Sequence, residues 1–250
     1  MINIFKANLH KLIKNIYFII GCIIAFAVTY GFSSRTLQFG PFRNLNSGEI
    51  MFFVSAAIVL FFSVFAPISV CSSYSDGYIR NRIIAGYTQK EDYLAHVLAL
   101  EAAVVIMHVF YLAGGIIGII SEGEPLSVIP VLPIILMLIA VFGYTALVAS
   151  IAYRFKNMIA GVVAGMLIFN LAYSFVMFGN FLLMITADKP SFKIAAFVYN
   201  INVLGQWFAN TPFIDDGVNA GAPMQFISSV AVIAFSLIVG CIGLEKRDLK

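Results

Sequence analysis

Apolar residues are arranged in long stretches along the chain, separated by short polar segments. A helix that crosses a bilayer needs about 20 mostly apolar residues. Six stretches meet this requirement, at residues 15–32, 50–73, 93–120, 127–153, 158–186 and 224–244. Pro67, Pro130 and Pro133 mark expected kinks or helix entries. No repeat or linker divides the stretches. The pattern therefore predicts an all-α integral membrane protein with one transmembrane domain over residues 1–250.

Two further segments carry shorter apolar patterns. In residues 3–15, apolar residues lie between three lysines at close to helical spacing, which predicts an amphipathic helix lying on the inner membrane surface. The alternative is a frayed tail. Residues 192–208 are apolar but interrupted by polar side chains, which are costly in hydrocarbon. We therefore expect two short helices between residues 187 and 223 that dip into the outer leaflet or cover the outer surface. Tyr199 and Trp207 would suit interfacial depth.

The positions of Lys and Arg predict the orientation. With the N-terminus inside, the inner segments hold eleven basic residues and the outer segments hold four, and eleven plus four accounts for all fifteen. The outer loop at 121–126 carries only acidic charges, at Glu122 and Glu124. Basic residues concentrate on the cytoplasmic side of membrane proteins. The pattern places the protein in the cell membrane with both termini in the cytoplasm.

Composition agrees with a membrane location and limits the chemistry. Hydrophobic residues make up 61% of the 250 residues and charged residues 11%, whereas a soluble domain has roughly 45–50% and about 25%. A net charge of +3 is too small to indicate a nucleic-acid partner. The three cysteines lie far apart in apolar runs, which argues against a disulfide framework or a metal site. Catalytic motifs and an ATP-binding phosphate loop are absent from the sequence.

One ionisable cluster falls inside the third predicted span, at His96, Glu101 and His108. Glu101 and His108 share a helix face but lie two turns, or about 10 Å, apart, which is too far for joint metal ligation. Glu101 is either a functional intramembrane acid or a structural residue near the inner interface, paired with a base such as Arg154 or Lys156.

The fifth predicted span combines small and polar residues. Gly161 and Gly165, like Gly114 and Gly118 in the third span, form a small-x-x-x-small pattern that allows close helix contact. Polar residues follow that lipid contact would not favour, and these either pack against protein or line a substrate path: Asn170, Tyr173, Ser174 and Asn180.

The cytoplasmic loop at 74–92 contains a short amphipathic segment. Ser75 or Asp76 is expected to cap a helix over residues 78–85, and Gly86 to end it. Its polar residues are Arg80, Asn81 and Arg82, and its apolar residues are Tyr78, Ile79, Ile83 and Ile84. Such a helix either docks into the groove of a partner or lies on anionic lipid.

The same loop resembles a known motif. Gly77-x-x-Arg80-Asn81-Arg82-Ile83-Ile84-x-Gly86-x-Thr88 resembles the cytoplasmic loop of type-2 ABC exporter permeases, although Gln89 stands where a basic residue is frequent. The ending Leu244-Glu245-Lys246-Arg247-Asp248 is similar to the usual ending of that family. The order of spans and the loop lengths extend the resemblance over the whole chain.

The resemblance implies a homodimer bound to two copies of a separate ATPase subunit, which would hold ATP and Mg²⁺, so that this chain needs no cofactor of its own. The 78–85 helix would be the coupling helix, with Ile79 and Ile83 as apolar anchors and Arg80 and Arg82 as polar contacts. The second and fifth spans would line the dimer interface and the path, and the helices after the fifth span would form an outer gate.

Small permeases of this kind resemble exporters of amphipathic or antimicrobial peptides and hydrophobic drugs. Two alternatives come from other classes of protein. One is a membrane enzyme that uses Glu101 and His108, and the other is a non-transporting anchor or immunity subunit.

Overall fold

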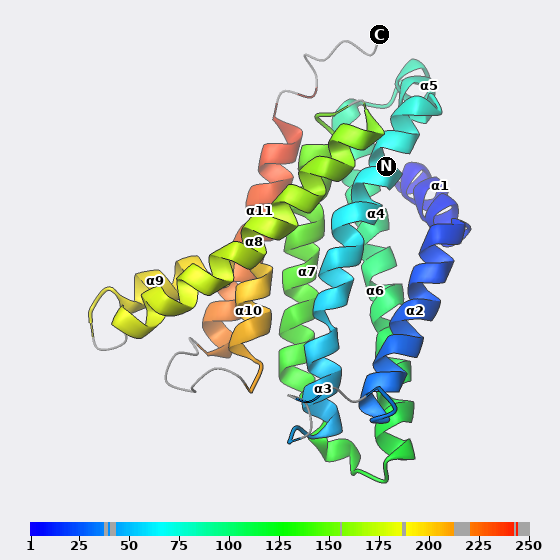
Figure 1. Cartoon of the computed structure of the whole chain (residues 1–250). Helices are drawn as coiled ribbons and strands as arrows, with labels where there is room; N and C mark the ends of the chain where they lie inside the picture. Colours follow the sequence, from blue (N-terminus) through cyan, green and yellow to red (C-terminus); the bar gives the residue numbers. More distant parts are fainter. Residues whose placement is uncertain are drawn as a thin grey trace.

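The computed structural model describes residues 1–37, 40, 44–155, 157–186, 189–212, 221–242 and 244, and these form helices joined by turns, with no strand among them (Figure 1). The tail at 245–250, Lys156 and the stretch 213–220 lie outside the described residues. The predicted all-α class is confirmed for the described part of the chain.

Six helical segments are long and apolar enough to cross a membrane, as the sequence predicts. Their ends fall within four residues of the predicted bounds. They are α2 (Ile16–Ser33), α3 and α4 together (Ser47–Ser75), α6 (Gln89–Ser121), α7 (Val131–Ala152), α8 (Met158–Thr186) and α11 (Ala222–Cys241).

Two of the three prolines expected at kinks or helix entries lie at the start of a helix. Pro130 is the N-cap residue of α7, and Pro133 lies in its first turn. Pro67, expected to kink the second span, lies inside α4 (Ala56–Ser75). That span is interrupted instead at Ser55, between α3 (Ser47–Val54) and α4.

The N-terminal segment forms α1 (Ile2–Ile13), which packs on α6. Its buried residues are Ile4, Asn8 and Leu12, which are four apart and therefore share one face. The protein itself therefore covers this face of the predicted amphipathic helix, and the placement of the helix on the inner membrane surface stays a prediction. Lys11 forms an ion pair with Asp76 at 3.0 Å.

Two short helices, α9 (Phe192–Ile201) and α10 (Val203–Ala209), follow α8. Tyr199 and Trp207 were expected at interfacial depth, but both are buried in the protein. Tyr199 donates a hydrogen bond to Asn180 Oδ1 at 2.6 Å, and Trp207 Nε1 donates to the carbonyl of Phe53 at 3.0 Å. Their polar atoms therefore bind partners within the chain, and their depth in the membrane stays a prediction.

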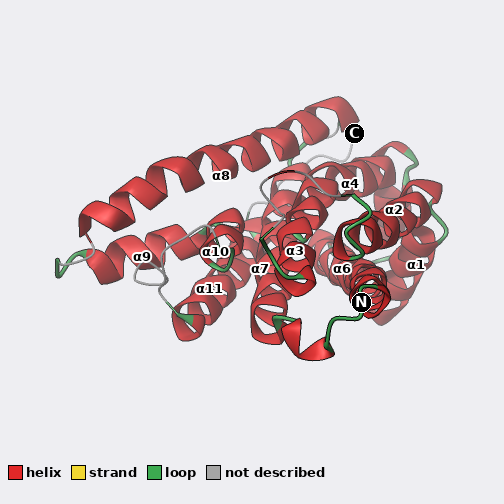
Figure 2. Cartoon of the chain, turned by 60° about the horizontal axis from the view of Figure 1, so that its bottom comes forward, coloured by secondary structure: helices red, strands yellow, loops and turns green. Residues whose placement is uncertain are grey.

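Helix α8 is the least covered span. It crosses α4 and α7 obliquely and then runs away from the other spans, with α9 beside its far half (Figure 1). From below, α8 forms one edge of the molecule, with α9, α10 and α11 beneath it (Figure 2). In an apolar stretch of 18 residues within α8, only 17% of the residues are buried inside the protein, whereas 61% are buried in the corresponding stretch of the second span.

Glycine contacts join two pairs of spans, as the small-x-x-x-small patterns predict. A Cβ atom added at Gly165 of α8 would collide with the Ser63 carbonyl of α4, and one at Gly161 would lie 2.8 Å from Cys71 Sγ. A Cβ atom at Gly118 of α6 would lie 2.7 Å from Ser33 Cβ at the end of α2. The backbones of these spans therefore approach closely.

An ion pair joins two loops at the end of the bundle opposite α1. Arg35 donates to Glu124 Oε1 at 2.6 Å, and the Ser47 N–H donates to Glu124 Oε2 at 3.0 Å. Both loops were predicted to lie on the same side of the membrane. Partial burial acts to raise the pKa of Glu124, but these hydrogen bonds and the Arg35 charge lower that pKa below its usual value.

The Glu124 contacts predict a pH-dependent stability. Because the folded-state pKa is depressed, the stabilisation is present above the usual pKa of about 4.3 and is lost as pH falls through the lower folded-state pKa. The melting temperature of the parent should therefore exceed that of Glu124→Gln at pH 7, and the gap should close as pH falls through the lowered pKa of Glu124. The exposed neighbour variant Glu122→Gln should show no such gap. A gap for Glu124→Gln that is constant with pH would contradict a charged contact.

Candidate functional site

The loop between the second and third spans forms a short helix, α5 (Tyr78–Ile84). Gly77 and Gly86 frame it with φ values of +74° and +92°, which glycine adopts without steric cost. The Tyr87 and Gly86 N–H groups donate to the Arg82 and Ile83 carbonyls, which closes the helix with a Schellman motif. The expected capping by Ser75 or Asp76 is wrong, because Ser75 ends α4 and Asp76 is its C-cap.

The two faces of α5 differ in exposure. Ile79 is only 1% exposed and belongs to the core, and Ile83 packs partly against that core. Ile79, expected as an apolar anchor for a partner, is therefore covered by the chain itself, whereas Ile83, the other expected anchor, is half-buried. The uncovered side carries instead Tyr78, Arg80, Asn81 and Ile84, and the Ile84 side chain is 74% exposed.

Arg82 connects the covered side of α5 to two other helices. Its Nη1 donates to Asp92 Oδ1 of α6 at 2.6 Å, and its Nη2 donates to Asn8 Oδ1 of α1 at 2.7 Å. The Asp92 side chain is fully buried and that of Arg82 is 16% exposed. Arg82, expected to contact a partner, therefore serves an internal ion pair.

Asp92 extends this contact into the bundle. Tyr153, the C-cap residue of α7, donates its hydroxyl to Asp92 Oδ2 at 2.9 Å. The Tyr74 hydroxyl of α4 donates to the Tyr153 carbonyl at 3.2 Å. His96 stacks edge-on against Tyr153 and shares a 2.9 Å hydrogen bond with Ser69 of α4. We call Arg82, Asp92, Tyr153 and His96, with their partners, the buried polar network. It joins α5 to α1, α4, α6 and α7.

Glu101 lies apart from this network. It lines a cavity between α6, α7 and α11, and its Oε2 atom is buried without a hydrogen-bond partner among the described residues. None of the ion pairs among the described residues joins Glu101 to Arg154, whose Nη2 donates to the Val239 carbonyl at 2.7 Å. Lys156, the other expected base, lies outside the described residues. His108 is not among the residues that line the Glu101 cavity, and it shares a hydrogen bond with the Val104 carbonyl.

The four polar residues of α8 divide into two groups. Asn180 accepts the Tyr199 hydrogen bond and has a packing role. Asn170, Tyr173 and Ser174 are exposed on the uncovered part of α8, and Asn170 donates to the Met166 carbonyl of its own helix at 2.8 Å. The structure does not bring any of these residues to the Glu101 cavity.

A polar cluster that the sequence analysis missed lies beneath α8. Gln206 of α10 donates to Ser229 Oγ of α11 at 2.9 Å and to the Asn200 carbonyl of α9. Gln206 and Ser229 line a cavity of about 400 Å³ between α7, α8 and α11, whose other walls are mainly apolar. The sequence does show a glutamine and a serine inside apolar runs, which could have marked them as candidates. It does not show that the two side chains meet, because only the fold brings α10 and α11 together.

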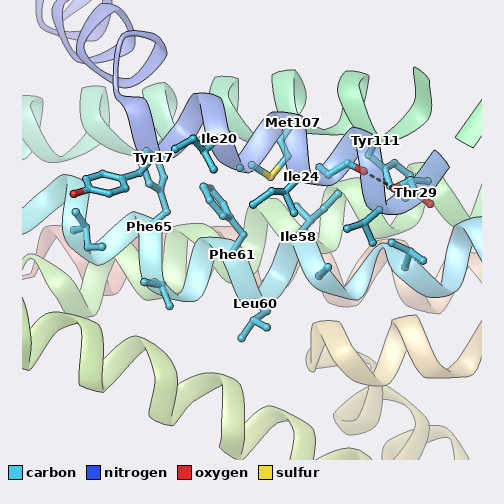
Figure 3. A pocket seen from close by; sticks show the side chains of 17 residues that line it. Tyr17, Ile20, Ile24, Thr29, Ile58, Leu60, Phe61, Phe65, Met107 and Tyr111 are labelled. Atoms are coloured by element: carbon cyan, nitrogen blue, oxygen red, sulfur yellow. Dashed lines mark hydrogen bonds between the residues drawn. The ribbon is translucent and has the colours of Figure 1, made fainter. Parts of the chain in front are cut away.

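A second large cavity, of about 410 Å³, separates α2 from α4. Figure 3 shows Tyr17, Ile20 and Ile24 of α2 on one side and Phe61 and Phe65 of α4 on the other. The hydroxyls of Thr29 and Tyr111 at its wall bond to the carbonyls of Ala25 and Met51. The cavity therefore presents an apolar surface suited to hydrocarbon.

The fold and these sites define an all-helical protein with six candidate membrane spans and a short helix anchored at one end of the bundle. Comparisons of the chain with models of protein families, with characterised proteins and with solved structures found no match.

Proposed function

We propose that this chain is the membrane subunit of an ATP-driven exporter of the type-2 ABC permease kind. The observation that carries the proposal is the two-sided character of α5. Its outer side presents Tyr78, Arg80, Asn81 and Ile84, while its inner side is held by the buried polar network. A force applied to the outer side would be transmitted to four other helices, since packed and hydrogen-bonded elements move as units.

In this proposal α5 docks on a separate ATP-binding subunit, which carries ATP and Mg²⁺, and two such subunits serve a homodimer. Both termini and α5 then lie in the cytoplasm, α1 lies near the inner membrane surface, and α9 and α10 lie near the outer surface as a gate. The excess of basic residues in the inner segments supports this orientation.

The uncovered apolar side of α8 supports a second copy as its partner in the membrane. The close contact of α8 with α4 at Gly165 places the second and fifth spans together, and the polar residues Asn170, Tyr173 and Ser174 would then face the path. The apolar cavities support a hydrophobic or amphipathic cargo, such as an antimicrobial or toxin-like peptide or a drug.

The test is co-purification of the chain with a candidate ATP-binding subunit, to be sought among the reading frames next to its gene. Ile84→Asp should reduce the retained ATPase by about tenfold or more, because burying one apolar side chain contributes roughly 1.5–3 kcal/mol and each 1.4 kcal/mol is a factor of ten. The complex should also lose cargo-stimulated ATP hydrolysis. Because ATP-binding subunits are cytoplasmic, retention by the parent also checks the side on which α5 lies.

The matched control is Leu126→Asp, which places the same charge at an exposed apolar residue between α6 and α7, at the opposite end of the bundle. It should retain the ATPase at the parental ratio. If Ile84→Asp retains it equally well, α5 is not the docking element, and a helix that only lies on lipid is the better interpretation. ATPase retention without ATP-dependent cargo movement would favour an anchor or immunity subunit.

A further inference from the structure

The Glu101 cavity has the composition of a binding site for a small amphiphile. It has a volume of about 230 Å³ and lies between α6, α7 and α11, with Met1 at its edge. Glu101 is the one ionisable side chain among the residues that line it, and no ion pair joins Glu101 to the α-amino group of Met1. The other walls are apolar, including Leu98, Phe142 and Leu237. A ligand that fills it would therefore need an apolar body and one group that a carboxyl can bind.

The carboxyl group of Glu101 has no hydrogen-bond or ion-pair partner among the described residues. Its Oε2 atom is buried and accepts no hydrogen bond from the described residues, and none of the ion pairs among those residues includes Glu101. Burying a carboxylate without a compensating charge or donor is costly, and acidic residues in membrane spans mark functional sites by default. A cationic ligand would supply the missing partner.

The cavity is reached from the side of the bundle. Leu98, one of its walls, is 47% exposed. Glu101 lies twelve residues after Gln89, at which α6 begins, and this corresponds to about 18 Å along the helix axis. A ligand dissolved in the bilayer could therefore reach the cavity at the exposed side chain of Leu98.

We infer that this cavity binds a small lipophilic ammonium, with its positive charge on the Glu101 carboxyl group and its apolar body against Leu98, Phe142 and Leu237. The volume corresponds to about eight times the roughly 30 Å³ that one water occupies in the liquid, so a ligand of about eight or nine non-hydrogen atoms fits. This inference is independent of the transport proposal, because it concerns the isolated chain without ATP.

The test uses the full chain in phosphatidylcholine nanodiscs and equilibrium dialysis of two ligands, with binding to empty discs subtracted. 2-Phenylethylammonium is the probe, and 2-phenylethanol is its neutral counterpart of equal size. The parent should bind the ammonium at least tenfold more tightly than the alcohol. Glu101→Gln should abolish that difference, and the exposed-loop control Glu122→Gln should preserve it.

A second variant covers the case in which Glu101→Gln fails to fold. Leu98→Trp places a bulky side chain at the exposed wall, leaves the carboxyl group in place, and should weaken ammonium binding at least tenfold. Equal binding of ammonium and alcohol by the parent would overturn the inference. Unchanged ammonium binding by a folded Glu101→Gln or by Leu98→Trp would overturn it as well.

Discussion

Replacing Arg82 with alanine is expected to lower the free energy of unfolding by about 3–5 kcal/mol, because the fully buried Asp92 carboxylate would lose its cation. The loss also removes the hydrogen bond from Arg82 to Asn8 and so separates α5 from α1. The measurement is denaturant-induced unfolding of the purified chain in detergent.

Arg80→Ala is the matched control, since Arg80 lies two residues away on the same helix and is exposed. A surface substitution of that kind should change stability by no more than about 0.5 kcal/mol. The double variant Arg82→Ala/Asp92→Asn should recover part of the loss, because it removes the stranded charge. Equal effects of the two arginine variants would show that the buried polar network does not hold α5.

The second large effect is expected at the contact between α4 and α8. Gly165→Ala places a Cβ atom against the Ser63 carbonyl, so the two backbones must separate. Overpacking of this kind costs typically 1–3 kcal/mol, although alanine is favoured over glycine in a helix by about 1 kcal/mol. We therefore expect a net lower melting temperature for the purified chain.

Gly40→Ala is the comparison, because an added Cβ atom there meets nothing within 4 Å. Its melting temperature should match that of the parent. If Gly165→Ala is as stable as the parent or more so, helix propensity outweighs the contact, and α4 and α8 need not approach closely. In that case the support for a shared role of the second and fifth spans would also be lost.

The spans could be predicted from sequence because their signal is local. A long apolar run is visible without any knowledge of neighbours, and all six segments appear within four residues of their expected bounds. The short helix α5 was likewise visible from Gly86 and the alternation before it. The side of α5 that is covered was not visible, because Ile79, Ile83 and Ile84 are equally apolar, and only the positions of α1, α4 and α6 decide which is buried.

The partners of polar residues were decided by the tertiary structure alone. The sequence shows Asp92, Arg82, Tyr153 and Glu101, but hydrogen bonds depend on distances of about 3 Å between residues far apart in the chain. Arg82 therefore joins Asp92 within the bundle rather than a partner protein, while Glu101 faces an apolar cavity. By itself, the sequence determined that the chain is helical and suited to a membrane, because composition and periodicity are properties of single segments. Which charges are paired and which remain open to a ligand was decided by packing, which brings distant segments together.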